Sequence, residues 1–529
     1  MSEIGRQDYQ GLADEFADRI AAGTLRPGEQ LPTQRAYARR RGIAPSTATR
    51  VYRELVRRGL VAGEVGRGTF VRAAPAAGGP ALAEPAAAPI DLELNYPVIP
   101  GQSALLARAL GPLLRADALD FALRPSGVAG TAAARTHFAA LAAEADPDGS
   151  WSPAPDAVLF TGNGRQAAAA ALSALVPRGG RLGVEALTYP GIKGLARQQG
   201  ITLVPLPMDG RGVIPEALAA IHRAAPLRAV YLQPCAHNPL GLSMDAERRD
   251  ALADVLRQAD LYAIEDAVWS FLAPHAAPLA PAAPDRVVRI DSLSKRLAPG
   301  LSVGFLIAPG LTVGLGAGAG SGTGIGPAGA GARTGTGAQP RAQSRAQAQA
   351  LHAALATAVR AAAALPSAFA LEAAVRWLDD GTVDQITAAK RADAAARQRL
   401  ARTHLAAAHA PDRPSAHAPD GPSAHASDGP SAHAPDGASA HAPDGPSAHP
   451  SEGPFEHSYS YWWELPEPWR AETFVAAAAR LGIAITPGSA FAADPRSNPR
   501  AVRIGLASPP LDVLEHTLGT LARLRHAGP

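Results

Sequence analysis

The chain has only three lysines, so chemistry that needs a reactive amine has few candidates. They are Lys193, Lys295 and Lys390. Lys295 lies three residues after the end of a β-rich run over residues 286–292. A lysine at such a junction, if desolvated or surrounded by cations, can lose its proton near neutral pH and attack an aldehyde. Lys193 follows a turn and Lys390 lies in an alanine-rich helical run, so we expect both to be surface charges.

Other fragments carry groups suited to a phosphorylated pyridine aldehyde. Residues 161–167 (TGNGRQA) run from a predicted strand into a predicted helix, whose N-terminal N–H groups suit a phosphate. Tyr189 could stack on a planar ring, and Asn238 could bond to a phenolic oxygen. Asp266 beside a pyridine nitrogen would keep it protonated and strengthen the ring as an electron sink. Singly these are a packing aromatic, a turn residue and a strand-end cap. Together with Lys295 they predict a pyridoxal 5'-phosphate (PLP) site.

The elements that must position these residues alternate along the chain. Short β-rich runs are separated by alanine- and leucine-rich helical stretches, and the clearest runs span residues 157–161, 228–234, 261–266 and 286–292. This alternation predicts an α/β fold with a mostly parallel central sheet.

The 529 residues are too many for one typical domain, and composition marks a boundary near the N-terminus. Residues 73–90 are mostly alanine, proline and glycine, which is linker composition. We therefore divide the chain into a head, residues 1–72, a linker, residues 73–90, and a body, residues 91–529. Two low-complexity segments of the body, at about 309–350 and 409–457, are interpreted as disordered inserts.

The second insert repeats a histidine every eight residues from His409 to His457. Imidazoles can collect a transition metal, but this period fits neither a structural zinc pattern nor one face of a helix, so we expect a linker and no metal site. The single cysteine, Cys235, cannot form an intrachain disulfide, which favours a reducing, cytoplasmic setting. No segment has the composition of a membrane span.

The head has the pattern of a small helical domain with a β-hairpin. The spacing of apolar residues predicts helices over residues 9–22, 33–41 and 45–58, the last two forming a helix–turn–helix. Short β-rich runs at 60–63 and 68–71 flank a candidate wing. The head carries 13 arginines against 8 acidic residues, a net charge of +5, whereas the remainder is at −2. A polyanion could use this charge, although solvated basic faces are also common.

The head closely resembles the winged-helix heads of GntR-type regulators over nearly all of residues 9–72, from LRPGEQLPTQRAYARRRGIAPSTATR into the wing. The resemblance implies double-stranded operator DNA as the partner. The residues that it implies as DNA contacts are Arg35, Ser46, Thr47, Thr49, Arg50, Arg67 and Gly68. The alternative is a helical protein–protein module with solvated arginines.

The body resembles fold-type I aminotransferases, and the order of head, linker and body is similar to that of the MocR subfamily of GntR regulators. The resemblance implies a PLP domain with a smaller C-terminal α+β part, a homodimer, and Lys295 as the internal aldimine lysine. It implies Arg503 as the partner of a substrate or effector carboxylate, which suits its planar fork. The residues that it places around PLP are Gly164, Arg165, Gln166, Tyr189, Asn238, Asp266 and Ser292.

Two positions depart from this family pattern. Ser302 stands where the family usually has an arginine that clamps the phosphate, and Trp269 replaces a tyrosine that often assists the 3-hydroxyl. Arg296 is a candidate for the missing phosphate charge, and the indole N–H of Trp269 is a candidate donor in place of the phenol. The cofactor affinity of Arg296→Ala tests the first of these hypotheses.

These observations favour a DNA-binding transcriptional regulator whose body senses PLP, or an amine or amino acid, through the Lys295 aldimine. The main alternative is a catalytically active PLP-dependent aminotransferase or lyase that carries a DNA-binding head. A third possibility is a body that serves only as a dimerisation scaffold. Repeated turnover of amino acids to keto acids would favour the enzyme, and absence of the aldimine absorbance would favour the scaffold.

Overall fold

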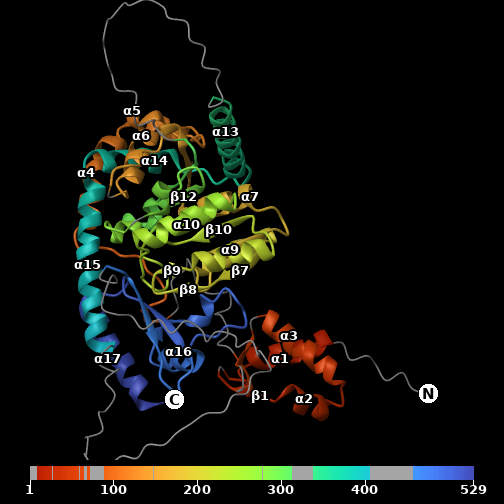
Figure 1. The fold of residues 1–529 in the computed structure, drawn as a ribbon. Coiled ribbons are helices and arrows are strands. Elements are labelled where there is room, and N and C mark those ends of the chain that lie inside the picture. The colour runs from red at the N-terminus through yellow and green to blue at the C-terminus, as the bar shows by residue number, and fades with distance from the viewer. Residues whose placement is uncertain are drawn as a thin grey trace, which may run out of the picture.

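The structure is a computed structural model. It describes residues 9–26, 28–58, 60–64, 68–71, 88–146, 148–276, 278–311, 338–405 and 457–528. Arg67, the centre of the first insert and the histidines from His409 to His449 lie outside these residues. The described residues form a head, a large domain and a small domain, which Figure 1 colours red, orange to green, and blue.

The head is a winged helix-turn-helix, as its sequence predicts. Its helices and strands are α1 (Tyr9–Ala21), β1 (Gln30–Leu31), α2 (Gln34–Arg41), α3 (Pro45–Arg57), β2 (Val61–Glu64) and β3 (Gly68–Val71). The Thr33 hydroxyl caps α2 by accepting from the Ala36 amide at 3.2 Å. Three aromatic rings, of Phe16, Tyr37 and Tyr52, meet at centroid distances of 5.0 to 6.1 Å in the core.

A seven-stranded sheet forms the centre of the large domain. In spatial order its strands are β5 (Val158–Thr161), β13 (Gly304–Ile307), β12 (Val287–Ser292), β11 (Tyr262–Asp266), β10 (Ala229–Leu232), β6 (Arg181–Glu185) and β7 (Thr202–Leu206). Strand β13 runs antiparallel to both neighbours, and the other pairs are parallel. The four strands predicted from the sequence are confirmed as β5, β10, β11 and β12.

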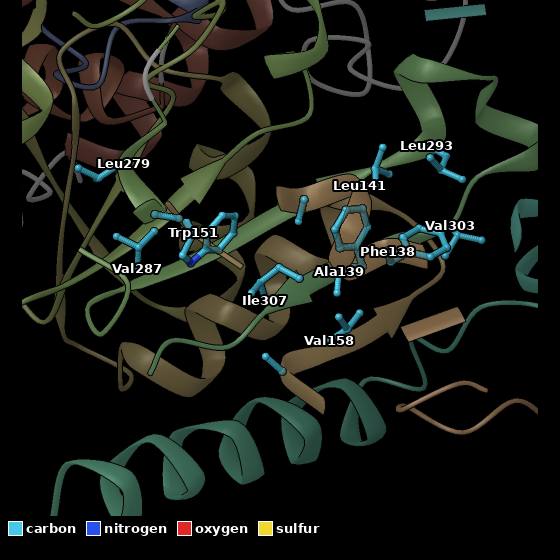
Figure 2. Packing of buried hydrophobic residues seen from close by; sticks show 14 of the residues in the cluster. Phe138, Ala139, Leu141, Trp151, Val158, Leu279, Val287, Leu293, Val303 and Ile307 are labelled. Carbon is cyan, nitrogen blue, oxygen red and sulfur yellow. The ribbon is translucent and has the colours of Figure 1, made fainter. Parts of the chain in front are cut away.

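Helices cover both faces of this sheet, which explains why its strands are continuous apolar runs. One face packs against α7 (Gly164–Leu175), α8 (Pro190–Gln199) and α13 (Ala338–Ala361). The other packs against α4 (Gln102–Leu110), α6 (Ala132–Ala143), α9 (Pro215–Ala224), α10 (Ala246–Gln258), α11 (Leu279–Ala282) and α14 (Ala368–Asp379). Figure 2 shows this second face, where Phe138 of α6 lies near Val158 and Ile307 of the sheet.

The first insert is shorter than its composition predicts. We interpreted residues up to about 350 as disordered, but α13 already begins at Ala338. Alanine, glutamine and arginine are strong helix formers, and Leu355 and Val359 of α13 are fully buried against the layer that contains α7. Tertiary packing therefore extends the ordered body into a segment that looks repetitive in sequence.

The small domain is connected to the large one by a long helix, α15 (Thr382–Leu405), which runs along one side of both in Figure 1. Its antiparallel sheet has the order β14 (Ser460–Glu464), β17 (Ala501–Gly505) and β16 (Thr486–Pro487), covered by α16 (Ala471–Arg480) and α17 (Leu511–Ala527). The first strand of the body, β4 (Ile90–Asp91), pairs with β15 (Ile483–Ala484) of this domain. The segment that follows the linker is thus built into the small domain.

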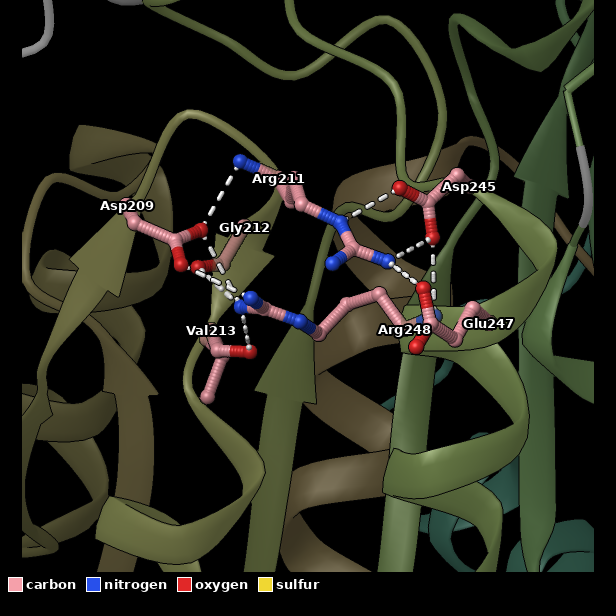
Figure 3. A network of polar contacts seen from close by, with 7 residues as sticks. All are labelled: Asp209, Arg211, Gly212, Val213, Asp245, Glu247 and Arg248. Atoms are coloured by element: carbon pink, nitrogen blue, oxygen red, sulfur yellow. Dashed lines mark hydrogen bonds and ion pairs between the residues drawn. The ribbon is translucent and has the colours of Figure 1, made fainter.

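A network of charged side chains lies at the start of α10, where Asp245 caps the helix (Figure 3). Arg211 follows β8 (Met208–Asp209), and its guanidinium donates to both carboxylate oxygens of Asp245 at 2.5 and 2.8 Å. Arg248 of α10 donates to Asp209 at 2.7 Å and to the carbonyl of Val213 in β9 (Gly212–Val213) at 2.9 Å. These contacts fix the start of α10 against the β8–β9 hairpin.

Two short helices complete the body: α5 (Ala116–Leu119) and α12 (Leu293–Arg296). Within the described part of the chain, no helix combines the length and apolar character needed to cross a bilayer.

Candidate cofactor and effector site

Lys295 lies on α12, a single helical turn that starts directly after β12. The Ser292 hydroxyl caps this turn by accepting from the Ser294 amide at 3.0 Å. The Lys295 Nζ donates to the carbonyl of Asn95 at 2.6 Å, and it lies 3.4 Å from the ring centroid of Tyr96. The amine is therefore held between the central sheet and the segment that opens the body.

The surroundings of Lys295 disfavour its charged form. Burial lowers its pKa well below the ordinary value, and the nearby cations Arg503, Lys390 and Arg165 lower it further, whereas Asp266 opposes the shift. The same interactions show that these charged groups converge on one site. A lysine with a lowered pKa has more of the neutral amine that attacks an aldehyde.

Asp266 ends β11 and is held by a residue that the sequence analysis did not identify. The hydroxyl of Tyr231, on the neighbouring strand β10, donates to the Asp266 Oδ2 at 2.5 Å, and the Val268 amide donates to its Oδ1 at 3.1 Å. Burial raises the pKa of Asp266 to about 6, and both hydrogen bonds oppose this shift. A positive group beside Asp266 would favour its ionised form.

The N-terminus of α7 and two serines form a compact cradle. Asn163 caps α7 by accepting from the Gln166 amide at 3.0 Å. A Cβ at Gly164 would lie only 3.1 Å from the Ser292 Cβ, so a side chain there would be tight against β12. The Ser292 and Ser302 hydroxyls lie 2.9 Å apart. The N-terminus of a helix beside serine hydroxyls is an arrangement that suits a phosphate.

Arg296 lies next to Lys295 but forms a separate ion pair. Its Nη2 lies 3.1 Å from the Asp291 carboxylate, and its guanidinium lies 5.3 Å from the Phe271 ring centroid. In the structure Arg296 pairs with Asp291. This pairing does not test its role as a substitute phosphate clamp, which therefore stays a prediction. Trp269 does lie at the site, with its ring 5.1 Å from the Lys295 Nζ.

Tyr189 and Arg165 approach each other across the site. Arg165 is at the start of α7, and its Nη2 lies 3.4 Å from the Tyr189 hydroxyl. The Tyr189 ring also covers Gly191, where a Cβ would come within 2.3 Å of the ring. Only glycine therefore leaves room for this ring position. Tyr96, which the sequence analysis missed, belongs to the same cluster.

The loop that carries Asn238 is positioned by buried polar side chains. Glu185, at the end of β6, accepts from the Gln233 amide at 2.8 Å, and its other oxygen lies 3.3 Å from the His237 Nε2. The side-chain oxygen of Gln233 in turn accepts from the main-chain N–H of Asn238 at 3.2 Å. Glu185 and His237 lie close in sequence to the predicted residues Tyr189 and Asn238, but only their tertiary neighbours reveal this positioning role.

Arg503 lies on β17 and faces the site. It is 5% exposed, and its Nη2 donates to the carbonyl of Glu93 at 2.5 Å and to the Thr486 hydroxyl at 2.9 Å. Burial lowers its pKa, and the carboxylates of Glu93 and Asp91 oppose the shift. Its Nε is buried with no hydrogen-bond partner among the described residues. This unused donor suits an incoming carboxylate.

The other two lysines correct a sequence expectation. Lys390 is fully buried, and its Nζ donates to the carbonyls of Lys295 and Leu297. Lys193 is half-buried and donates to the carbonyls of Ala490 and Ala492, both at 2.7 Å. The prediction of surface charges is therefore wrong for Lys390 and inaccurate for Lys193. Helical periodicity cannot show a second element packed over a polar face.

The predicted DNA contacts lie mainly on the start of α3. Ser46 and Arg50 are exposed there, as is Arg35 on α2. Thr47 and Thr49 are half-buried, and the Thr49 hydroxyl donates to the Gln34 side chain of α2 at 2.9 Å. Gly68 begins β3, whereas Arg67 lies outside the described residues.

The groups present fit PLP. The α7 cradle matches a phosphate, Asp266 matches a pyridine nitrogen, and Lys295 supplies an amine with a lowered pKa. Asn238 adds a buried side-chain oxygen with no partner in the described part of the chain, which marks unused hydrogen-bonding capacity beside the site.

Comparison with known families agrees with this architecture. Residues 8–71 match the model "Bacterial regulatory proteins, gntR family". Residues 127–521 match the model "Aminotransferase class I and II", which covers more than half of the chain. The chain belongs to the aminotransferase class I and II family. A GntR head joined to a class I and II body is the architecture expected from the MocR resemblance.

Relatives with both parts are named as regulators. The uncharacterised HTH-type transcriptional regulator YdeF of Bacillus subtilis is 31% identical over 305 residues, which cover 57% of this chain and 64% of that protein. The HTH-type pyridoxine biosynthesis transcriptional regulator PdxR of Corynebacterium glutamicum is 26% identical over 318 residues, covering 56% and 65%. The matches thus span slightly less than two thirds of these two relatives.

Solved structures of aminotransferases share the fold of the class I and II body. An archaeal alanine:glyoxylate aminotransferase superposes with a TM-score of 0.61 at 18% identity, over 83% of this chain and 91% of that one. The kynurenine aminotransferase of Pyrococcus horikoshii gives 0.60 at 17% identity, with the same coverage. At these identities the likeness shows the fold alone. The family as a whole depends on PLP.

Proposed function

We propose that this chain is a cytoplasmic, homodimeric DNA-binding transcriptional regulator. Its body binds PLP at Lys295 and senses PLP, or an amine or amino acid that reacts at the same site. PLP supplies an aldehyde for the Lys295 amine and a ring that withdraws electrons. Asp266 would hold the ring nitrogen, the α7 cradle would hold the phosphate, and Arg503 would bind a ligand carboxylate.

One observation carries the regulatory part of this proposal. The linker from the head enters the body at β4, and the next residues run directly through the site. The Arg503 guanidinium donates to the Glu93 carbonyl at 2.5 Å, and the Lys295 Nζ donates to the Asn95 carbonyl at 2.6 Å. The two groups that would bind an effector thus contact the segment that joins the body to the head.

This arrangement couples ligand binding at Lys295 and Arg503 to the conformation of the segment that contains Glu93 and Asn95. A carboxylate that binds Arg503 through both Nε and Nη2 would compete with the Glu93 carbonyl for the Nη2 donor, so a ligand favours a conformation in which this contact changes. A ligand shifts an equilibrium only when it binds one conformation more tightly. Competition at Arg503 supplies that difference, and the linker passes the change toward the DNA-binding head.

The head supports DNA binding through its exposed polar and basic groups. Ser46 and Arg50 lie on the exposed side of α3, whose opposite side buries Ala48, Val51 and Leu55 in the head core. A recognition helix with its N-terminal residues exposed can enter a major groove, where arginines also bind phosphates.

A homodimer is supported by exposed apolar side chains near the start of the body. Val98, Leu114 and Leu123 are 64%, 66% and 83% exposed, and all lie within about 25 residues of one another in the chain. Single exposed hydrophobics are common, but several from one segment favour an interface. We propose a second copy of this chain as the partner, because two heads would then read paired half-sites.

The test compares operator binding with and without PLP. Genomic DNA recovered with the protein identifies the site, and fluorescence anisotropy then measures its affinity for the wild type and for Lys295→Ala. We expect PLP to change the affinity of the wild type at least about fivefold and to leave that of Lys295→Ala unchanged. Equal affinity with and without PLP and with added amino acids would overturn the regulatory proposal.

The catalytic alternative is favoured by the same convergence of Lys295, Asp266 and Arg503. Incubation of PLP-loaded protein with amino acids distinguishes the two functions. Many keto acid molecules formed per protein molecule would identify an aminotransferase. A spectral change without turnover would support a sensor.

A further inference from the structure

Lys390 is a buried cation for which the proposed function has no role. It lies on α15, is 0% exposed, and directs its side chain to α12, the turn that carries Lys295. Its Nζ donates to the carbonyl of Lys295 at 3.0 Å and to that of Leu297 at 2.7 Å. A second lysine therefore holds the main chain of the first.

The shortness of α12 explains why these carbonyls need an external donor. The helix has only four residues, so the carbonyls at its C-terminal end lack intrahelical partners. A cation near a helix C-terminus is favourable, and hydrogen bonds from a charged donor are stronger than neutral ones. Gln102 of α4 adds a third contact, because its Nε2 donates to the Leu297 carbonyl at 3.0 Å.

Lys390 is itself firmly anchored. The Tyr459 hydroxyl lies 2.8 Å from the Lys390 carbonyl and 2.9 Å from the Asp393 carboxylate. Arg397 donates to the same carboxylate at 2.8 Å and to the carbonyls of Leu506 and Pro509. These contacts join α15 to the small domain, so the position of Lys390 is fixed by both domains.

We propose that Lys390 is a positioning residue for Lys295. Its ammonium holds the backbone of α12 so that the Lys295 amine meets the cofactor site, and its charge disfavours the protonated form of that amine. The inference rests on the proposed binding of PLP at Lys295.

The electrostatics agree with this geometry. The positive charge of Lys390 is among the causes that lower the pKa of Lys295. Within the described part of the chain, Lys390 interacts with titratable residues on three segments: its charge lowers the pKa of Lys295 of α12, Asp393 of its own helix raises its pKa, and the Tyr459 hydroxyl before β14 donates to its main-chain carbonyl. Burial lowers the pKa of Lys390 to about 7, and Asp393 opposes the shift. The charge of Lys390 is therefore present well below pH 7 and is lost as the pH rises through that value.

The experiment separates the charge of Lys390 from its hydrogen bonds. Lys390→Gln keeps N–H donors and removes the charge, whereas Lys390→Met removes both. Lys193→Gln is a matched control, because Lys193 also donates to two backbone carbonyls but is not among the charges that shift Lys295. The Kd for PLP is measured by absorbance titration of the full chain between about pH 5.5 and 9.

We expect PLP binding to strengthen as the Lys295 amine loses its proton. Removing the Lys390 charge raises the pKa of that amine, so the pH profile of Lys390→Gln should move upward by roughly 0.5–1 unit. Lys390→Met should show the same displacement and bind PLP about tenfold more weakly at every pH. Lys193→Gln should keep the wild-type profile.

A profile of Lys390→Gln that superposes on that of the wild type would overturn the inference. An equal loss of PLP affinity at every pH in both Lys390 variants would also overturn the inference. That result would show that Lys390 only contributes to packing. If Lys390→Met does not fold, the glutamine variant decides alone. Failure of the proposed function looks different: borohydride reduction of the PLP-treated wild type would then leave no pyridoxyl group on Lys295.

Discussion

Asp266 shows how a half-buried carboxylate can be kept for a ligand. It lies at the carboxyl end of β11, where burial raises its pKa to about 6 while the Tyr231 hydroxyl and the Val268 amide stabilise its charged form. Among the described residues no ion pair offsets the desolvation of Asp266, although its charge interacts with that of Lys295. A protonated pyridine nitrogen would supply one.

The sign of the resulting pH dependence follows from linkage. The ordinary pKa of Asp266 is 3.8, so between about pH 4 and 6 the folded protein binds more protons than the unfolded chain, and stability falls as the pH rises. We expect Asp266→Asn without PLP to gain about 2 kcal/mol relative to the wild type over this range. Denaturant unfolding at pH 4 and pH 7 measures the difference. The exposed Asp156→Asn is the control, and a pH-independent difference for Asp266→Asn would contradict the expectation.

Arg503 is expected to determine how tightly the site binds a ligand with a carboxylate. Its planar fork can bind a carboxylate through two parallel hydrogen bonds, which a lysine cannot reproduce. In PLP-loaded Arg503→Lys, we expect the amino acid that most perturbs the wild-type spectrum to bind about 10- to 100-fold more weakly. The Kd for PLP should stay within about twofold. Absorbance titrations measure both constants, and unchanged amino acid affinity would remove Arg503 from the effector site.

At the scale of elements, the site is assembled from the ends of strands and the starts of helices. Asn163 and Ser292 cap α7 and α12, and they bring the first N–H groups of α7 beside the Ser292–Ser302 pair. Helix α15 supplies Lys390, whose Nζ donates to the main-chain carbonyl of Lys295. Each element contributes one or two groups, so the site depends on how strands and helices pack.

The recognition helix α3 gives the prediction that belongs to this scale. Arg50 is exposed on α3 and is expected to contact phosphate, so Arg50→Ala should weaken operator binding and reduce the salt slope of log K by about 1. Arg19→Ala on α1 is the control, since Arg19 packs on Phe16 within the head. Anisotropy titrations at several salt concentrations measure both slopes. Equal slopes for Arg50→Ala and the wild type would exclude Arg50 from the interface.

At the scale of the whole molecule, the first residues of the body connect the parts. Leu92 pairs with the small domain through the Ala484 carbonyl and the Gly505 amide, and the Asn95 side chain contacts Ser460 at 3.2 Å. The same stretch accepts hydrogen bonds from Lys295 and Arg503. A movement of residues 92–95 would displace the end of the linker, because the two segments are continuous in sequence.

Hydrogen exchange tests this connection. We expect peptides covering residues 90–97 to change their exchange rate when PLP is added, and to change again when an amino acid engages Arg503. Lys295→Ala should lose the first response. Peptides of α10, which lies on the far side of the Asn238 loop, provide an internal control. Identical exchange in all states would argue against transmission through this segment.

The motifs around Lys295, Asp266 and Asn238 could be picked out from the sequence because each residue sits in a short, regular context of strand, turn or helix, and their roles toward PLP stay predictions. The phosphate cradle followed for the same reason. Tyr231, Asn95 and Lys390 were not identified. Each acts through a partner 35 to 200 positions away along the chain, at a distance that local periodicity does not encode.

Local patterns of apolar, turn and cap residues were enough to predict the winged head and the α/β body, while the linker and the reactivity of Lys295 stay predictions. The groups that surround Lys295 could be found only from the folded arrangement. The burial of Lys390, the engagement of Arg296 by Asp291 and the passage of Glu93 and Asn95 across the site arise from packing between distant segments. Desolvation and charge proximity exist only after those segments meet.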